Sequence, residues 1–199
     1  MSKTTRLIFI IGTLAGIVLV AAWGLPKLRP HTFYGTLLQS PDKAPDFTLD
    51  SVLGELSLED FRGQIVMLYF GYTFCPDVCP ATLAEVSGAM ELLGKQAEDV
   101  QVIMVSVDPL RDSVEELDEY VSHFYPSFLG VTGSEEKIAS LATLYGVFYE
   151  KHEGTEATGY LIDHTATVMV IDRDGHLKLI FPFGAPAAEI AEDIAYLLK

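Results

Sequence analysis

The sequence predicts an α/β domain in which a central sheet is flanked by helices. Two apolar runs rich in β-branched residues, 65–70 and 100–107, have the length and composition of buried strands. A helix signal follows each run, as apolar periodicity over 81–93 and as a capping box before 113–124. A hairpin pattern over 165–181 then precedes a last helix. Strands that alternate with helices and finish in this way are typical of a thioredoxin-like sheet, and we expect that fold.

The first half of the domain is expected to begin at Pro45, with a short strand at 55–58 before the first buried strand. Pro80 suits the first position of the following helix, because its missing N–H has no partner to lose there. The apolar face of that helix consists of Leu83, Val86, Met90 and Leu93.

The second half carries two helix starts. Ser113 and Glu116 form the capping box, and Ser134 opens another helix that runs to about residue 144. The polar residues 151–159 are expected to form an exposed loop.

The hairpin and the closing helix complete the domain. Residues 165–171 and 176–181 are predicted strands joined by the tight turn 172–175, which ends in glycine. The closing helix spans 187–198 and is apolar at Ile190, Ile194 and Leu197.

The N-terminal region is dominated by an uncharged apolar run at residues 7–25. A helix of that length spans about 28 Å, close to the hydrocarbon thickness of a bilayer. We therefore expect a tail at 1–6, a single transmembrane helix at 7–25, a linker at 26–44 and the thioredoxin-like domain at 45–199. A cleaved signal peptide is the alternative interpretation, although no clear cleavage site follows the run.

Basic residues flank the predicted anchor on both sides, so the bias toward a cytoplasmic N terminus is slight. They are Lys3, Arg6, Lys27 and Arg29. The leading tail is too short for a mitochondrial transit peptide. We predict a bacterial cytoplasmic-membrane protein with its domain on the periplasmic side.

All acidic side chains lie beyond residue 30. The chain carries a net charge of −15, and because four basic residues precede residue 31, residues 31–199 carry −19. Such a domain repels nucleic acid and anionic lipid, and it attracts a basic partner face. Solubility alone is the other interpretation of this charge.

The two cysteines of the chain, Cys75 and Cys79, lie between the first buried strand and the helix that follows it. If Cys79 lies in the first helical turn, the Cα atoms are about 6 Å apart. That separation permits a disulfide, or two thiolates on one soft metal ion.

A third ligand must come from elsewhere in the chain. Four histidines are expected to be solvated or locally bonded: His31, His123, His152 and His176. His164 precedes a predicted strand, at a place that faces the cysteine turn in thioredoxin-like folds. Spacing alone leaves it as well suited to the core or a loop as to a metal, but its place in the fold favours a ligand. Two thiolates and an imidazole form a trigonal site that suits copper in either oxidation state.

Three motifs in order resemble the Sco/SenC family, over about three quarters of the chain. They are Phe70-Gly71-Tyr72-Thr73-x-Cys75-Pro76-Asp77-x-Cys79-Pro80, Ser106-Val107-Asp108-Pro109-x-Arg111-Asp112 and Tyr160-Leu161-x-Asp163-His164. Leu110 departs from the family, which often has an acidic residue there.

The resemblance implies a membrane-anchored copper metallochaperone, rather than an enzyme, that delivers copper to the binuclear copper centre of cytochrome c oxidase. Cys75, Cys79 and His164 match the family's ligands for Cu(I) and Cu(II). The implied partners are the copper-receiving oxidase subunit and a thiol reductant or copper donor. Asp163 is a candidate to orient the His164 ring, and Asp108 with Arg111 is expected to form a local ion pair without a chemical role.

The competing hypothesis is a thiol–disulfide oxidoreductase that uses Cys75 and Cys79 as a redox-active disulfide to reduce cysteines of a copper-receiving partner. The three intervening residues differ from the usual two-residue spacing of such enzymes. His164 also has no role in thiol exchange, whereas a metal site needs it.

Overall fold

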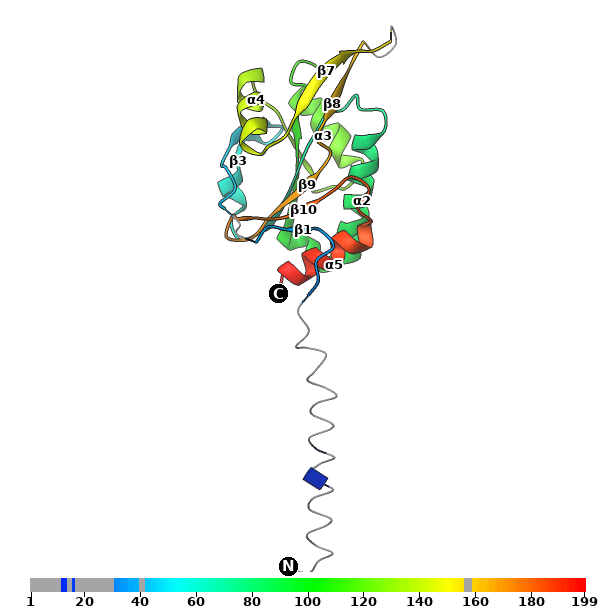
Figure 1. The fold of residues 1–199 in the computed structure, drawn as a ribbon. Coiled ribbons are helices and arrows are strands. Elements are labelled where there is room, and N and C mark those ends of the chain that lie inside the picture. The colour runs from blue at the N-terminus through cyan, green and yellow to red at the C-terminus, as the bar shows by residue number, and fades with distance from the viewer. Residues whose placement is uncertain (1–11, 14–15, 17–30, 40–41, 156–158) are drawn as a thin grey trace, which may run out of the picture. The chain divides into compact units, whose positions relative to one another are not determined.

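A six-stranded mixed sheet forms the centre of the unit Phe33–Lys199, with the strand order β1-β10-β9-β4-β5-β6 (Figure 1). The strands β4, β5 and β6 are parallel, whereas β9 runs antiparallel to β4, and β10 and β1 continue the antiparallel half. Their bounds are Thr36–Leu37 (β1), Ile65–Gly71 (β4), Val100–Ser106 (β5), Leu129–Val131 (β6), Val168–Ile171 (β9) and Leu177–Phe181 (β10). The predicted α/β class is confirmed.

The computed structural model describes residues 12–13, 16, 31–39, 42–155 and 159–199. The predicted tail and nearly all of the predicted anchor lie outside these residues. Within the part that is described, no helix has the length and hydrophobicity that a bilayer crossing requires.

Helices cover both faces of the sheet. Figure 1 shows α2 (Val78–Leu93) and α5 (Ala187–Leu197) on one side and α4 (Glu135–Leu144) on the other. Side chains alternate along β4, so Tyr69 points toward α2 while the Phe70 ring meets Tyr145 at the end of α4. The remaining helices are α3 (Val114–Ser122), η2 (Leu58–Phe61) and η3 (Gly94–Asp99).

The predicted helix starts are confirmed with small shifts. Ser113 and Glu116 form the capping box of α3, and the Ser134 side chain accepts the Lys137 N–H at the start of α4. The helix α2 begins at Val78, two residues before Pro80.

The strand β1 lies inside the segment 26–44 that the sequence analysis assigned to a linker. Two residues are too few to show a strand pattern, and β1 is held by tertiary contacts. It pairs with β10, and the buried carboxylate of Asp193 on α5 accepts the N–H groups of Tyr34 and Gly35 just before it, at 2.9 Å each.

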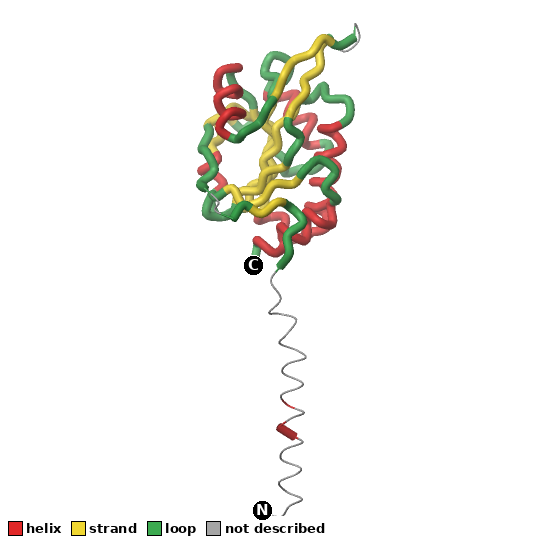
Figure 2. The backbone as a smooth tube through the Cα atoms, viewed as in Figure 1, coloured by secondary structure: helices red, strands yellow, loops and turns green. Residues whose placement is uncertain are grey.

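Two small sheets lie outside the central one. The first joins β2 (Thr48–Ser51) to β3 (Gly54–Ser57), and the second joins β7 (Tyr149–Glu153) to β8 (Tyr160–His164). We call the second the β7–β8 hairpin, and Figure 2 shows it at the end of the domain opposite the C terminus. The prediction of a loop at 151–159 was wrong for β7, whose polar side chains are mostly exposed and show no alternation between apolar and polar residues.

Candidate metal centre

Two loops meet where the parallel strands β4 and β5 end. The cysteine loop, residues 72–77, follows β4, and residues 107–113 follow β5. The Val107 N–H donates to the Gly71 carbonyl at 2.8 Å, which ties the starts of the two loops together. Loops at the carboxyl ends of strands are the usual place for a site in an α/β sheet.

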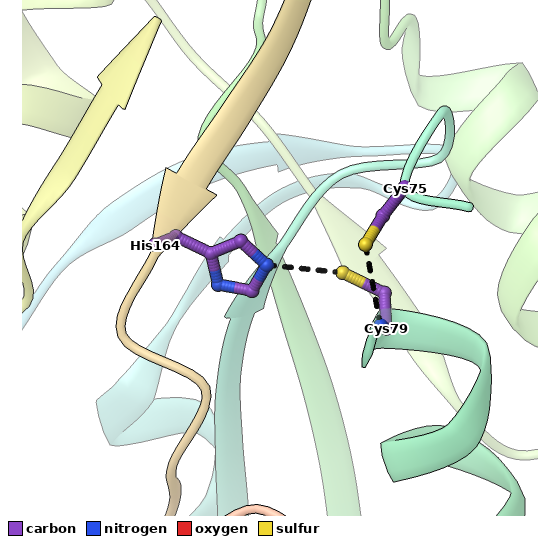
Figure 3. Close-up of side chains that lie close together, drawn as sticks. All are labelled: Cys75, Cys79 and His164. Carbon is purple, nitrogen blue, oxygen red and sulfur yellow. Dashed lines mark hydrogen bonds between the residues drawn. The ribbon is translucent and has the colours of Figure 1, made fainter. Parts of the chain in front are cut away.

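The two cysteine sulfurs lie at the start of α2, as predicted. Cys79 is in the first turn and fully buried, whereas Cys75 is half-buried in the loop. Both are free thiols, and the Cys79 N–H donates to Cys75 Sγ at 3.3 Å (Figure 3).

His164 is the last residue of β8, and its ring points at the cysteine pair (Figure 3). Nε2 lies 3.3 Å from Cys79 Sγ, and Nδ1 lies 3.2 Å from the Thr165 carbonyl oxygen. Because a carbonyl only accepts, the Thr165 contact favours the tautomer with the proton on Nδ1. Nε2 is then the nitrogen that faces the sulfurs, and its lone pair is available to a metal ion.

The structure thus brings together all three predicted site residues, with their ligand atoms within 4.8 Å of one another. No other such group of three or more His, Cys, Asp or Glu occurs among the described residues. Three of the other histidines have the local partners expected of them: His123 contacts the Glu119 carbonyl, His152 pairs with Asp163, and His176 pairs with Asp172.

The hypothesis that Asp163 orients the His164 ring is wrong. The carboxylate of Asp163 lies 3.1 Å from His152 Nε2, and its side chain is 79% exposed. Successive side chains of a strand point to opposite faces, so Asp163 and His164 cannot both face the cysteines. The backbone carbonyl of Thr165 takes the role that we had assigned to Asp163.

Aromatic side chains enclose the imidazole. The rings of Tyr69 and Tyr72 meet the His164 ring edge-on, at centroid distances of 6.1 and 5.9 Å. Gly71 leaves the space that this packing needs, because a Cβ there would lie 2.9 Å from Cys79 Sγ and 2.8 Å from the Tyr69 ring. Steric exclusion of a Cβ atom therefore explains why glycine occupies this position of the first motif.

The two thiols differ strongly in acidity. Hydrogen bonding from the Cys79 side chain lowers the pKa of Cys75 to about 3. The same contact, together with burial, raises the pKa of Cys79. The more acidic sulfur is therefore that of Cys75, which is also the more accessible one.

A cavity of about 370 Å³ lies beside the site and gives access to it. Cys75 and His164 line it together with Tyr72, Pro76, Ala166 and Phe183. Buried Cys79 does not line it, so an incoming group reaches Cys75 and His164 first.

Asp112 holds the cysteine loop through hydrogen bonds to Thr73, a role that we did not predict from the sequence. Its buried carboxylate accepts the Thr73 hydroxyl at 2.6 Å, the Thr73 N–H at 3.1 Å and the Ser106 hydroxyl at 2.6 Å. Burial raises the pKa of Asp112. Asp112 belongs to the second motif, and only the fold brings it into contact with Thr73 of the first motif.

Comparisons with known proteins agree with this architecture. Residues 36–199 match the SCO1/SenC family model. A SCO2-like protein of Rickettsia prowazekii is 31% identical over 197 residues, which is 96% of each chain. The solution structure of the apo Sco1 protein from Thermus thermophilus is 44% identical, covers 84% of this chain and 98% of its own, and has a TM-score of 0.76. This likeness confirms the thioredoxin-like fold.

A second solved structure, Bradyrhizobium japonicum ScoI, has copper bound. It is 34% identical, covers 78% of this chain and 99% of its own, and has a TM-score of 0.71. Together with the family match over most of the chain, these likenesses show that the chain belongs to the SCO1/SenC family.

Proposed function

We propose that this protein is a copper metallochaperone that binds one copper ion through Cys75, Cys79 and His164 and delivers it to the binuclear copper centre of cytochrome c oxidase. The observation that carries the proposal is the convergence of three donor atoms within 4.8 Å. Membership of the SCO1/SenC family and the copper-bound relative support it.

The donor set fits copper as a cargo. Two thiolates suit Cu(I), and an imidazole suits both Cu(I) and Cu(II). Structural zinc sites are closed by four protein ligands, whereas this site has three and opens on a cavity. A ligand from a recipient protein can therefore enter beside Cys75 and His164 before the ion leaves.

The test is an anaerobic Cu(I) titration of the reduced full-length protein, for which we expect one ion per chain. The Cu(II) form should show sulfur-to-metal charge transfer in the near-ultraviolet and visible range. Replacing Cys75 by Ser should abolish both signals, whereas His152→Ala, a surface histidine of β7, should change neither. A folded, reduced protein that binds no stoichiometric copper would overturn the proposal.

We further propose that residues 7–25 anchor the chain in the bacterial cytoplasmic membrane, with the copper-binding domain on the periplasmic side. The uncharged length of this run supports the anchor. Protease added to right-side-out spheroplasts should digest the domain. Full protection would reverse the proposed orientation, and release of a shortened soluble form would favour the cleaved signal peptide.

A second candidate function is reduction of a partner's disulfide, and the close approach of two free cysteines favours it. Cys75 would attack the partner's disulfide and release one partner sulfur, and Cys79 would then attack the Cys75 sulfur of the mixed disulfide and release the other. Two electrons pass to the partner, whose two sulfurs take up their protons from the cysteine pair and from water, and a Cys75–Cys79 disulfide remains. A thiol reductant must restore the pair. This reaction does not use His164, which separates it experimentally from copper delivery.

A further inference from the structure

The guanidinium of Arg111 lies among aromatic rings from both sides of the metal centre. Its central carbon is 3.6 Å from the centroid of the Tyr160 ring and 4.8 Å from that of the Phe74 ring. Both distances are within the range of cation–π contacts. The Arg111 side chain is only 19% exposed, so water screens these contacts little.

The two rings belong to the two segments that carry the metal ligands. Phe74 directly precedes Cys75, and Tyr160 is the first residue of the five-residue strand β8, which ends at His164. Arg111 itself comes from the loop after β5. A single side chain therefore bridges the cysteine loop and the strand that presents the imidazole.

Hydrogen bonds among Arg111, Asp108 and Tyr160 reinforce this bridge. Arg111 Nε donates to the buried carboxylate of Asp108 at 2.5 Å, and the Tyr160 hydroxyl donates to the same carboxylate at 2.6 Å. Arg111 Nη1 also donates to the Tyr160 backbone carbonyl at 3.1 Å. These contacts hold both the ring and the backbone of Tyr160.

The β7–β8 hairpin needs such a fixing point. Its two strands form a sheet of their own, and within the described residues no ladder joins that sheet to the central one. The middle of β8 is held by Ile162, whose side chain is buried in the core and whose N–H donates to the Tyr72 hydroxyl at 3.1 Å. Side chains, rather than sheet pairing, set the distance from His164 to the cysteines.

We propose that Arg111 is a positioning residue for the metal centre, which clamps β8 to the cysteine loop and so holds His164 at ligand distance. From the sequence we expected only a local ion pair with Asp108; that pair is present, but it is one part of a larger clamp. The proposal rests on the proposed function where copper is concerned. Loss of the clamp should weaken the imidazole contribution and spare the two sulfurs.

Arg111→Gln is the direct test, with Arg173→Gln as the matched control. Arg173 also forms an ion pair, with Asp99 at 3.0 Å, but Asp99 lies before the start of β5, at the other end of the sheet. We expect Arg111→Gln to lower the Cu(II) affinity about tenfold to a hundredfold, the usual effect of removing a group that orients a ligand. Arg173→Gln should leave the affinity unchanged.

A double-mutant cycle with His164→Ala separates positioning from general damage. If Arg111 acts through His164, Arg111→Gln should have almost no further effect on Cu(II) affinity once His164 is absent. Formation of the Cys75–Cys79 disulfide should persist in every variant. Equal losses with and without His164, or no loss in the single variant, would overturn the proposal.

Amide hydrogen exchange of the metal-free protein tests the clamp without copper. Exchange at residues 160–164 should accelerate in Arg111→Gln and stay unchanged in Arg173→Gln. If Arg111→Gln does not fold, Tyr160→Leu removes the main stacking ring and should give the same pattern. Unchanged exchange overturns the clamp. A wild-type protein that binds no copper, yet shows the exchange effect, overturns only the proposed function.

Discussion

The cysteine loop and the β7–β8 hairpin supply ligands to the same centre but are built in different ways. Cys75 and Cys79 follow β4, the fully buried strand in the middle of the sheet, and Cys79 belongs to the first turn of α2. His164 ends a strand of a separate two-stranded sheet with mostly exposed side chains on β7. Cys79 is thus part of the core and Cys75 packs against it, whereas the imidazole ends a strand that joins the domain through side-chain contacts and not through the central sheet.

This difference has a chemical consequence. Substitutions in the hairpin should move the imidazole without separating the sulfurs, so they should alter copper binding and leave disulfide formation intact. Substitutions in the core beneath the cysteines should alter both. The imidazole half of the site can therefore be perturbed without the sulfur half.

His164→Ala should give the largest of these effects. Removing the imidazole leaves two sulfurs, and we expect Cu(II) affinity to fall at least about a hundredfold, equivalent to about 2.7 kcal/mol. Titration with Cu(II) measures the loss, and thiol counting after mild oxidation should show that the disulfide still forms. His152→Ala is the matched control, because His152 lies on the same hairpin and contacts Asp163 instead of a cysteine.

The same variant discriminates between the two candidate functions in cells. Copper delivery predicts a clear loss of cytochrome c oxidase activity with His164→Ala, whereas disulfide reduction predicts nearly normal activity. Near-normal activity would therefore count against the chaperone proposal even if the purified variant lost copper.

Gly71→Ala tests the core side of the comparison. The new Cβ would lie 2.9 Å from Cys79 Sγ and 2.8 Å from the Tyr69 ring, and both neighbours are buried. Overpacking of this kind costs about 1–3 kcal/mol of unfolding free energy. Denaturant unfolding of the reduced, metal-free protein measures it.

Unlike the hairpin variant, Gly71→Ala should impair disulfide formation as well as copper binding, because it displaces a sulfur. If the variant has wild-type stability and forms the disulfide normally, the neighbouring side chains can move to accommodate the new Cβ, and the prediction is wrong.

The sequence predicted the core half of the site better than the hairpin half. An unbroken apolar run, a CxxxC pair and apolar helical spacing report directly on β4, the loop and α2, because burial forces those residue types into that order. The start of α3 was equally readable, since its capping box depends on residues three apart.

The hairpin had no such signal. Most of β7 faces solvent, so its sequence, Tyr-Glu-Lys-His-Glu, resembles a loop although it pairs with β8 along its full length. The partners of Arg111 were equally hidden, because Phe74 and Tyr160 are distant from it in sequence and meet it only in the fold. The place of His164 in the expected fold and the resemblance to the Sco/SenC family made it a ligand candidate, but only the structure indicated what holds it in place.

Asp163→Asn should give the smallest effect, and it sharpens the comparison by testing which contacts of the hairpin matter. Asp163 adjoins His164 in sequence, but it lies on the opposite face of β8 and pairs with His152. Both side chains of that pair are well exposed, and exposed ion pairs contribute little. We expect Cu(II) affinity to stay within about threefold of wild type, in line with a surface contribution of that size. A loss as large as that of Arg111→Gln would mean that the exposed face of the hairpin also orients the imidazole, and that the clamp at Tyr160 does not act alone.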